Sequence, residues 1–173
     1  MPATSRSRRA IELILTDVDG VLTDGALLIS ADGLESKRFH VRDGAALKWW
    51  RETGGHTGII SGRSSRAVEV RASELGIDFV HQGVKNKLEV AQGILEHLNL
   101  SPDQVCFIGD DLQDLAVMEH CGLAAAPADA CLEVRQAADY VSVVPGGHGA
   151  VRDVIEMILK KQSQWTALLR SHQ

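Results

Sequence analysis

Short apolar runs alternate with longer amphipathic segments along most of this chain. The runs near 11–16, 57–60, 105–108 and 123–126 are continuously apolar, which is typical of strands buried on both faces. Segments with helical spacing of apolar residues lie between these runs, and the connections are short. Repeated strand–helix units of this kind predict an α/β fold, a doubly wound parallel sheet with helices on both faces.

Glycine and turn residues set the limits of the expected elements. Two strands, near 26–30 and 36–41, are joined by a turn at 31–33 and form a β-hairpin insertion after strand one. Further short strands are expected near 78–80 and 140–143. The expected helices cover 44–52, 65–75, 85–98, 112–120, 129–137 and 149–161.

Length and composition restrict the class of protein. A chain of 173 residues fits one domain, with its body at 11–161, a disordered basic leader at 1–10 and a polar C-terminal tail at 162–173. The net charge of -5 argues against a nucleic-acid partner, and no apolar run has the length of a membrane span. Three cysteines without a C-x-x-C pattern fit a reducing compartment, so we expect a cytoplasmic protein, while an organelle-targeting leader stays open.

Two aspartates, Asp17 and Asp19, follow the first expected strand and enter a turn that contains glycine. Ligands bind at this carboxyl end of the strands in an open α/β sheet. Phosphoryl transfer through an aspartyl phosphate needs a nucleophilic carboxylate beside an acid/base carboxylate. The same residues also suit an ordinary turn, because Asp-Gly pairs favour turns. Other parts of the chain have to separate these two interpretations.

Further polar side chains follow the later strands. Ser61 comes after the run at 57–60, Lys87 begins a helix after the third strand, and the acidic segment 109–114 follows a buried strand. Each has a simpler explanation when taken alone. Ser61 suits a helix N-cap, Lys87 suits the surface, and acidic residues suit the start of a helix. Because all of them follow strand ends, they predict one shared crevice.

The carboxylates expected in this crevice would repel one another. Two like charges 4 Å apart repel by about 4 kcal/mol at an effective dielectric constant of 20, and a phosphate dianion adds to this. A hard divalent cation relieves the repulsion, and Mg2+ suits a site of few carboxylates, waters and a phosphate. The charges of Asp17, Asp19 and Asp110 therefore predict Mg2+, with Lys87 as a second positive charge and Ser61 holding phosphate oxygens.

These motifs resemble those of the haloacid dehalogenase superfamily of phosphatases, which implies a Rossmann-like core. The matching positions are D-x-D-G at 17–20, Ser61, Lys87 and G-D-D-x-x-D at 109–114. The chain also looks like the subgroup of 3-deoxy-D-manno-octulosonate 8-phosphate phosphatases over about residues 11–160. The motifs that carry this likeness are V-R-D-G at 41–44, S-G-R at 61–63, Q-G at 82–83, N-K at 86–87 and G-G-x-G-A-V-R at 146–152.

The resemblance implies catalytic roles for particular residues. Asp17 would be the nucleophile and a Mg2+ ligand, and Asp110 would be a further ligand. Asp19 would protonate the leaving sugar oxygen, activate water in the second step and lend its backbone carbonyl to the metal. The residues implied to support the metal shell are Asp111 and Asp114, and those implied to hold the phosphate and steady the nucleophile are Ser61 and Lys87.

The resemblance also implies a sugar-acid phosphate substrate whose carboxylate is bound by arginine. Arg63 is the first choice for this contact. The full set of implied substrate contacts is Asp19, His40, Val41, Arg42, Asp43, Gly44, Lys48, Gly62, Arg63, Arg71 and Lys87. One departure from the subgroup is His148, where Arg or Lys is expected. If His148 touches the substrate, its charge would depend on pH near neutrality.

The spacing of the motifs leaves no room for a cap domain over the site. The gaps from 19 to 61 and from 61 to 87 are both too short. Exclusion of water strengthens the electrostatics of such a site, so something other than a cap domain has to cover it. The resemblance implies a homotetramer with shared active sites, in which hairpins associate and a neighbour's C-terminal segment reaches the site. The apolar segment 26–29 suits such an interface.

We therefore expect a Mg2+-dependent phosphatase of an eight-carbon sugar-acid phosphate, acting in lipopolysaccharide sugar biosynthesis. A phosphatase of nine-carbon, sialic-type acid 9-phosphates stays open, although Arg63 favours the eight-carbon substrate. A receiver-type phospho-accepting signalling module carries similar residues, but its acceptor aspartate would follow the third strand rather than the first. A catalytically silent oligomerisation domain is the remaining alternative, and the acids at Asp17, Asp19 and Asp110 disfavour it.

Overall fold

A single six-stranded sheet forms the centre of the computed structural model, which describes residues 10–172. All neighbouring strands are parallel, and their order is β5-β4-β1-β6-β7-β8. This confirms the expected doubly wound α/β fold. Apart from residue 10, the expected leader at 1–10 lies outside the described residues. The strands are β1 Leu13–Thr16, β4 His56–Ile60, β5 Phe79–His81, β6 Val105–Ile108, β7 Leu123–Ala126 and β8 Tyr140–Val141.

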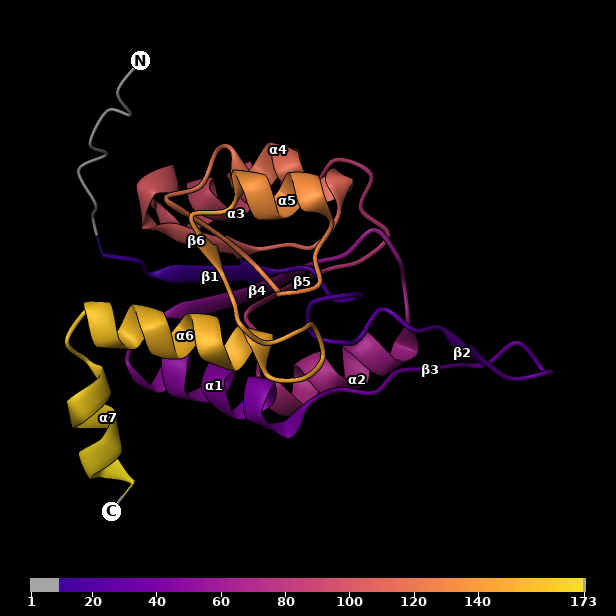
Figure 1. The fold of residues 1–173 in the computed structure, drawn as a ribbon, viewed down its shortest axis with the longest axis horizontal. Helices are drawn as coiled ribbons and strands as arrows, with labels where there is room; N and C mark the ends of the chain where they lie inside the picture. The colour runs from indigo at the N-terminus through magenta and orange to yellow at the C-terminus, as the bar shows by residue number, and fades with distance from the viewer. Residues whose placement is uncertain (1–9, 173) are drawn as a thin grey trace.

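Helices cover both faces of this sheet (Figure 1). Helices α1, α2 and α6 lie on one face, and α3, α4 and α5 lie on the other. No helix in the described part of the chain is long and apolar enough to cross a membrane. The helices are α1 Val41–Glu52, α2 Arg66–Leu75, α3 Lys87–Leu98, α4 Leu115–Met118, α5 Leu132–Ala137, α6 Ala150–Lys161 and α7 Trp165–Ser171, with short 3-10 helices at Pro102–Gln104 and Leu112–Asp114.

The central strand β1 is buried on both faces, which explains its continuous apolar sequence. Leu13 and Leu15 join the core beneath α3, α4 and α5, whereas Ile14 joins the core beneath α1, α2 and α6. Successive side chains of a strand point to opposite faces, so both cores hold β1 in place. Burial of each such side chain contributes about 1.5–3 kcal/mol. The residues that follow Thr16 are therefore fixed at the carboxyl end of the sheet.

The inserted hairpin projects away from the layered core (Figure 1). Its strands, β2 Leu28–Ile29 and β3 Glu35–Ser36, are antiparallel and shorter than the expected 26–30 and 36–41. Within residues 10–172 it is the only sheet besides the main one. Four of its large apolar side chains are exposed, namely Leu27, Leu28, Ile29 and Leu34.

The helices differ from the expected ranges most clearly at the start of α1, in α4 and α5, which are shorter than expected, and in the C-terminal tail. Helix α1 begins at 41 rather than 44, because His40 is the N-cap and its Nδ1 accepts a hydrogen bond from the Arg42 backbone at 3.3 Å. Histidine is not among the favoured capping residues, so the sequence did not indicate this start. The expected polar tail contains α7, whose Leu168 packs into the core shared with α1 and α6.

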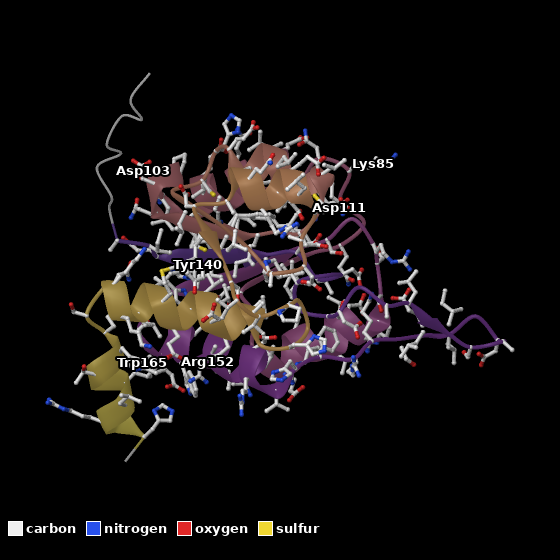
Figure 2. All side chains as sticks on the ribbon, viewed as in Figure 1. Lys85, Asp103, Asp111, Tyr140, Arg152 and Trp165 are labelled. Atoms are coloured by element: carbon white, nitrogen blue, oxygen red, sulfur yellow. The ribbon has the colours of Figure 1, made fainter. Side chains whose placement is uncertain are left out.

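Helix α7 is attached through an aromatic cluster around Arg152 of α6. The guanidinium carbon lies 4.1 Å from the ring centroid of Trp49 and 5.6 Å from that of Trp165. The two indole rings meet edge to face at 6.4 Å. Figure 2 shows Arg152 and Trp165 near the junction of the last two helices. Cation–π contacts of this kind contribute about 0.5–2 kcal/mol, so the end of the chain is folded onto the core.

Candidate active site

Asp17 lies directly after β1, and both oxygens of its carboxylate have partners. The Val18 backbone donates a hydrogen bond to Oδ1 at 2.7 Å, and Lys87 Nζ lies 2.6 Å from Oδ2. The Asp17 backbone donates to the Ile108 carbonyl at 3.0 Å, which ties this residue to β6. Burial and, after it, the charge of Asp114 raise the pKa of Asp17, Lys87 and the hydrogen bond from Val18 lower it, and the net result is a pKa of about 6. The sheet therefore presents a buried, oriented carboxylate.

Lys87 is the first residue of α3, and its ammonium is buried between two aspartates. Nζ lies 2.6 Å from Asp17 Oδ2 and 2.7 Å from Asp114 Oδ1. Asn86 caps the helix by accepting a hydrogen bond from the Glu89 backbone at 3.2 Å. Burial lowers the pKa of Lys87, but the two carboxylates outweigh burial, so the net shift is upward. The charged ammonium offsets part of the negative charge in the site.

Asp114 organises the loop that follows β6. Its Oδ2 accepts hydrogen bonds from the backbones of Asp110 at 2.9 Å and Asp111 at 3.3 Å. A Cβ on Gly109 would overlap the Asp114 side chain, so glycine permits this close turn. Asp111 itself is exposed and accepts a hydrogen bond from the Leu112 backbone at 2.8 Å. These contacts explain the spacing of the G-D-D-x-x-D motif.

Three carboxylates form a cluster that fits the expected metal ion. One oxygen from each of Asp17, Asp110 and Asp114 lies within 4.8 Å of the others. Oδ1 of Asp110 is buried and has no hydrogen-bond partner among residues 10–172. Burial, followed by the charges of neighbouring aspartates, raises the pKa of Asp110 to about 8. A buried carboxylate oxygen without a partner, beside two further carboxylates, suits a hard cation such as Mg2+.

The turn after Asp17 packs directly against the glycine-rich loop at 145–149. Gly20 has a φ of +87°, and a Cβ there would overlap the Asp110 carboxylate. A Cβ on Gly146 would overlap the Gly20 carbonyl oxygen, and the Gly147 backbone donates to the Val21 carbonyl at 2.9 Å. The glycines thus allow the two loops and Asp110 to meet. His148 is exposed beside them, with Nδ1 2.7 Å from the Gly146 carbonyl oxygen.

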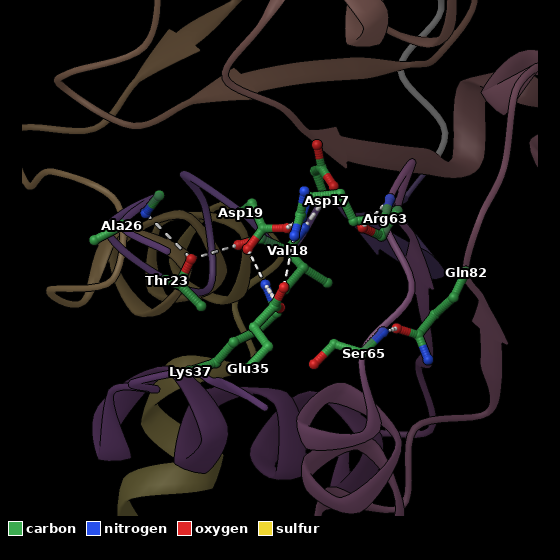
Figure 3. A network of polar contacts seen from close by, with 12 residues as sticks. Asp17, Val18, Asp19, Thr23, Ala26, Glu35, Lys37, Arg63, Ser65 and Gln82 are labelled. Atoms are coloured by element: carbon green, nitrogen blue, oxygen red, sulfur yellow. Dashed lines mark hydrogen bonds and ion pairs between the residues drawn. The ribbon is translucent and has the colours of Figure 1, made fainter. Parts of the chain in front are cut away.

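The carboxylate of Asp19 is held by two cations from different elements (Figure 3). Lys37, just after β3, contacts Oδ1, and Nε of Arg63 lies 3.7 Å from Oδ2. Both cations also pair with Glu35, Lys37 Nζ at 2.9 Å and Arg63 Nη2 at 2.6 Å. Glu35 and Lys37 were not among the site residues expected from the sequence. The signal that could have found them is their i, i+2 spacing, which places both side chains on one face of an extended segment.

Ser61 and Gly62 lie at the same edge of the sheet, because β4 pairs directly with β1. Ser61 is 2% exposed, and its Oγ accepts a hydrogen bond from the Arg63 backbone at 3.3 Å. A Cβ on Gly62 would lie 3.0 Å from the side-chain oxygen of Gln113. The strand order therefore brings this segment close to the loop after β6.

The other expected substrate contacts lie on α1 and α2 and face different surroundings. Asp43 is 1% exposed, and its Oδ1 accepts a hydrogen bond from the Arg152 backbone at 2.8 Å, which joins α1 to the start of α6. Arg71 pairs with Glu74 at 2.8 Å and lies so close to Gly44 that a Cβ there would overlap its guanidinium. His40 lines a narrow cavity together with Asp43, Gly44 and Arg71.

Val41, Arg42 and Lys48 are exposed on the surface of α1. Among the described residues, no hydrogen bond or ion pair joins them to the two aspartates that follow β1. Direct contacts within the described residues therefore link one group of the expected site residues, whereas the roles of Val41, Arg42 and Lys48 stay predictions. The group brought together consists of Asp17, Asp19, Ser61, Gly62, Arg63, Lys87, Asp110 and Asp114.

Comparisons with known proteins agree with this geometry. Residues 70–155 match the haloacid dehalogenase-like hydrolase family. The 3-deoxy-D-manno-octulosonate 8-phosphate phosphatase KdsC of Escherichia coli strain K12 is 42% identical over 154 residues, which cover 89% of this chain and 82% of that protein. The enzyme of the same name from Salmonella typhimurium has the same identity and coverage.

Solved structures of similar proteins share the fold over almost the whole chain. One is the 3-deoxy-D-manno-octulosonate 8-phosphate phosphatase of Moraxella catarrhalis in complex with magnesium, phosphate and KDO, with a TM-score of 0.92, 39% identity and 94% coverage of both chains. Another is the cobalt-bound phosphatase of Haemophilus influenzae, with a TM-score of 0.87, 37% identity and coverage of 90% and 91%. The chain therefore belongs to the 3-deoxy-D-manno-octulosonate 8-phosphate phosphatase family of haloacid dehalogenase-like hydrolases.

Proposed function

We propose that this protein hydrolyses 3-deoxy-D-manno-octulosonate 8-phosphate to 3-deoxy-D-manno-octulosonate and phosphate, a step of lipopolysaccharide sugar biosynthesis. The observation that carries the proposal is the oriented carboxylate of Asp17 beside Lys87 and Asp110 at the end of β1. Relatives with 42% identity bear the name of this reaction. The M. catarrhalis structure is named as a complex with magnesium, phosphate and the sugar product.

Asp17 is the proposed nucleophile. Its carboxylate oxygen forms a bond to phosphorus while the bond from phosphorus to the sugar oxygen breaks, which leaves an aspartyl phosphate. Val18 and Lys87 hold the two carboxylate oxygens before substrate arrives, so little reorientation is needed. Bound Mg2+, held by Asp17, Asp110 and the Asp19 carbonyl, would neutralise charge on the phosphoryl oxygens.

Asp19 is the proposed general acid and base. Its protonated carboxyl gives a proton to the leaving sugar oxygen in the first step. In the second step its carboxylate takes a proton from water, whose oxygen bonds to phosphorus and releases phosphate from Asp17. Oδ2 of Asp19 is buried and makes no hydrogen bond within the described part of the chain, which leaves it available for this transfer.

The remaining site residues are proposed to bind the substrate. Ser61 and Lys87 would hold phosphate oxygens, and Asp111 and Asp114 would support the loop around the metal. The side chain of Arg63 is 47% exposed, so its guanidinium is accessible to the carboxylate of a sugar-acid substrate. The other predicted sugar contacts are His40, Val41, Arg42, Asp43, Gly44, Lys48, Gly62 and Arg71.

We also propose a cytoplasmic homotetramer with shared active sites, in which 11–161 forms one phosphatase domain. The exposed apolar side chains of the hairpin support association, since contiguous patches of this kind often mark interfaces. Glu35 and Lys37 on the same hairpin reach Asp19, so hairpin contacts between subunits would also affect the site. Cys106 and Cys131 carry free thiols, as is common in a reducing compartment.

Phosphate release from the eight-carbon and nine-carbon sugar phosphates tests the proposed function. We expect Mg2+-dependent turnover, lost with EDTA, and a higher kcat/KM for 3-deoxy-D-manno-octulosonate 8-phosphate. Asp17→Asn should lower kcat at least about a thousandfold. Preference for the nine-carbon 9-phosphate would reassign the substrate, and turnover by Asp17→Asn close to the wild-type rate would refute the proposed nucleophile.

A further inference from the structure

The side chain of Lys37 is buried in the site although it belongs to the projecting hairpin. It is 1% exposed, contacts Asp19 Oδ1 and lies 2.9 Å from Glu35 Oε1. Removing an ammonium group from water is unfavourable unless opposite charges compensate for the lost hydration. The two carboxylates supply this compensation and raise the pKa of Lys37 above its usual value, although burial alone would lower it. The Lys37 ammonium is therefore charged and is held in position by Asp19 and Glu35.

Lys37 and Arg63 alternate with Asp19 and Glu35 in a closed ring of four charges (Figure 3). Each cation contacts both carboxylates, and each carboxylate contacts both cations. Lys37 is on one oxygen of Asp19, and Arg63 is on the other. Positive charge therefore lies beside both oxygens of the Asp19 carboxylate.

The two cations do not hold Asp19 equally. Arg63 is half exposed and its Nε is 3.7 Å from the carboxylate, which is too long for a hydrogen bond. Lys37 is buried and makes a hydrogen bond to the other oxygen. The orientation of Asp19 therefore depends mainly on Lys37, and Glu35 in turn holds Lys37.

We propose that Lys37 is a positioning residue that orients the Asp19 carboxyl group for proton transfer to the leaving sugar oxygen. The inference rests on the proposed role of Asp19 as the general acid. Glu35 supports this role by holding the ammonium with a carboxylate oxygen 2.9 Å away. The hairpin is thus part of the catalytic machinery of its own subunit, in addition to any contact that it makes with another copy of the chain.

The competing explanation is that Lys37 only attaches the hairpin to the core. Substrates with different leaving groups distinguish this structural role from the proposed positioning role. A sugar oxygen leaves as a poor, strongly basic group and needs the proton from Asp19, whereas p-nitrophenolate leaves without one. The value of kcat/KM covers the steps up to the aspartyl phosphate, so hydrolysis of that intermediate does not enter the comparison.

The experiment compares Lys37→Met with Arg38→Met on both substrates. Arg38 is the next residue, its side chain is 68% exposed, and it pairs with Asp24 rather than with Asp19. Lys37→Met should lower kcat/KM for the sugar phosphate at least about tenfold and that for p-nitrophenyl phosphate less than about threefold. Arg38→Met should change neither value. The molar mass by light scattering should be that of the wild type for both variants.

A second variant, Glu35→Gln, tests the same proposal if Lys37→Met fails to fold. It leaves Lys37 in place but weakens its support, so the same selective loss on the sugar phosphate is expected, at about threefold or more. Equal losses on both substrates, or no loss on either, would overturn the proposal. Asp19→Asn is measured in parallel, and sugar-phosphate turnover that survives in this variant would instead refute the proposed role of Asp19.

Discussion

The charge balance around Asp17 determines how individual residues behave in this site. One carboxylate oxygen from each of Asp17, Asp110 and Asp114 lies within 4.8 Å of the others, and the Lys87 ammonium contacts both Asp17 and Asp114. Burial keeps water from screening these charges, so the pKa of Asp17 rises to about 6 and that of Asp110 to about 8. A bound cation would remove the excess negative charge.

Substitution of Lys87 by methionine should destabilise the metal-free protein by about 3–5 kcal/mol, because it leaves two buried carboxylates without their cation. Urea unfolding at pH 7.5 measures the change. Lys160→Met is the matched control, since Lys160 is 56% exposed and pairs with Glu156 one helical turn away. That control should cost no more than about 0.5 kcal/mol. A Lys87→Met variant as stable as its control would contradict the proposed charge balance.

The raised pKa values of Asp17 and Asp110 predict how Mg2+ stabilisation depends on pH. A carboxyl group whose pKa is higher in the folded state contributes stability below its unfolded pKa, and this is lost as pH rises through the folded value. For the metal-free protein, the loss falls between about pH 4 and the folded values of about 6 and 8. Mg2+ binds the deprotonated carboxylates, so its stabilising effect should grow over the same interval.

Differential scanning calorimetry with and without Mg2+ tests this dependence. The rise in Tm caused by Mg2+ should be larger at pH 8 than at pH 5. Asp110→Asn serves as the control, because it removes one carboxylate of the cluster and should make the rise small at both values. An equal rise at pH 5 and pH 8 in the wild type would show that these carboxyls do not titrate with the metal.

The contact between the turn after β1 and the loop before α6 sets the positions of the site carboxylates. The turn after β1 and the loop before α6 approach each other at Gly20 and Gly146, where no side chain fits. The same turn touches Asp110, so a shift in one loop moves the carboxylates relative to each other. The sequence predicted these loops from glycine and strand-end patterns, but it could not predict that they pack on one another.

Gly146→Ala should separate the two loops and disturb the carboxylate cluster. We expect a loss of about 1–3 kcal/mol in the free energy of unfolding, together with reduced phosphatase activity. Gly93→Ala is the matched control, because nothing lies within 4 Å of a Cβ at that helical position. That control should gain about 0.5–1 kcal/mol, since alanine favours the helix. Full activity and unchanged stability in Gly146→Ala would show that the loops do not depend on this contact.

For the molecule as a whole, local patterns predicted the sheet but not the contacts between distant segments. Continuous apolar runs in β1 and β6 indicated buried parallel strands, and polar residues after them indicated the site edge. The contact of Lys37 with Asp19 depends on how the hairpin folds back, which no local pattern encodes. The same holds for Asp43, whose carboxylate meets the start of α6, a segment far along the chain.

We expect the subunits of the protein to associate through the hairpin. Ile29 is 61% exposed on β2, so Ile29→Lys should leave the fold intact and lower the molar mass measured by light scattering. Gln136→Lys is the control, because residue 136 is also exposed but lies on α5, outside both the hairpin and the C-terminal segment. A wild-type protein that is fully active as a monomer would contradict the proposed tetramer.

Detection of the phosphate bound to Asp17 is the most direct test of the proposed reaction. The enzyme is mixed with 3-deoxy-D-manno-octulosonate 8-phosphate and Mg2+, quenched in acid within one turnover, digested and analysed by mass spectrometry. We expect a phosphoryl group on Asp17 in the wild type and none in Asp17→Asn, which should release no phosphate above background. A phosphoryl group on another residue, or turnover by Asp17→Asn, would contradict the proposed role of Asp17 as the nucleophile.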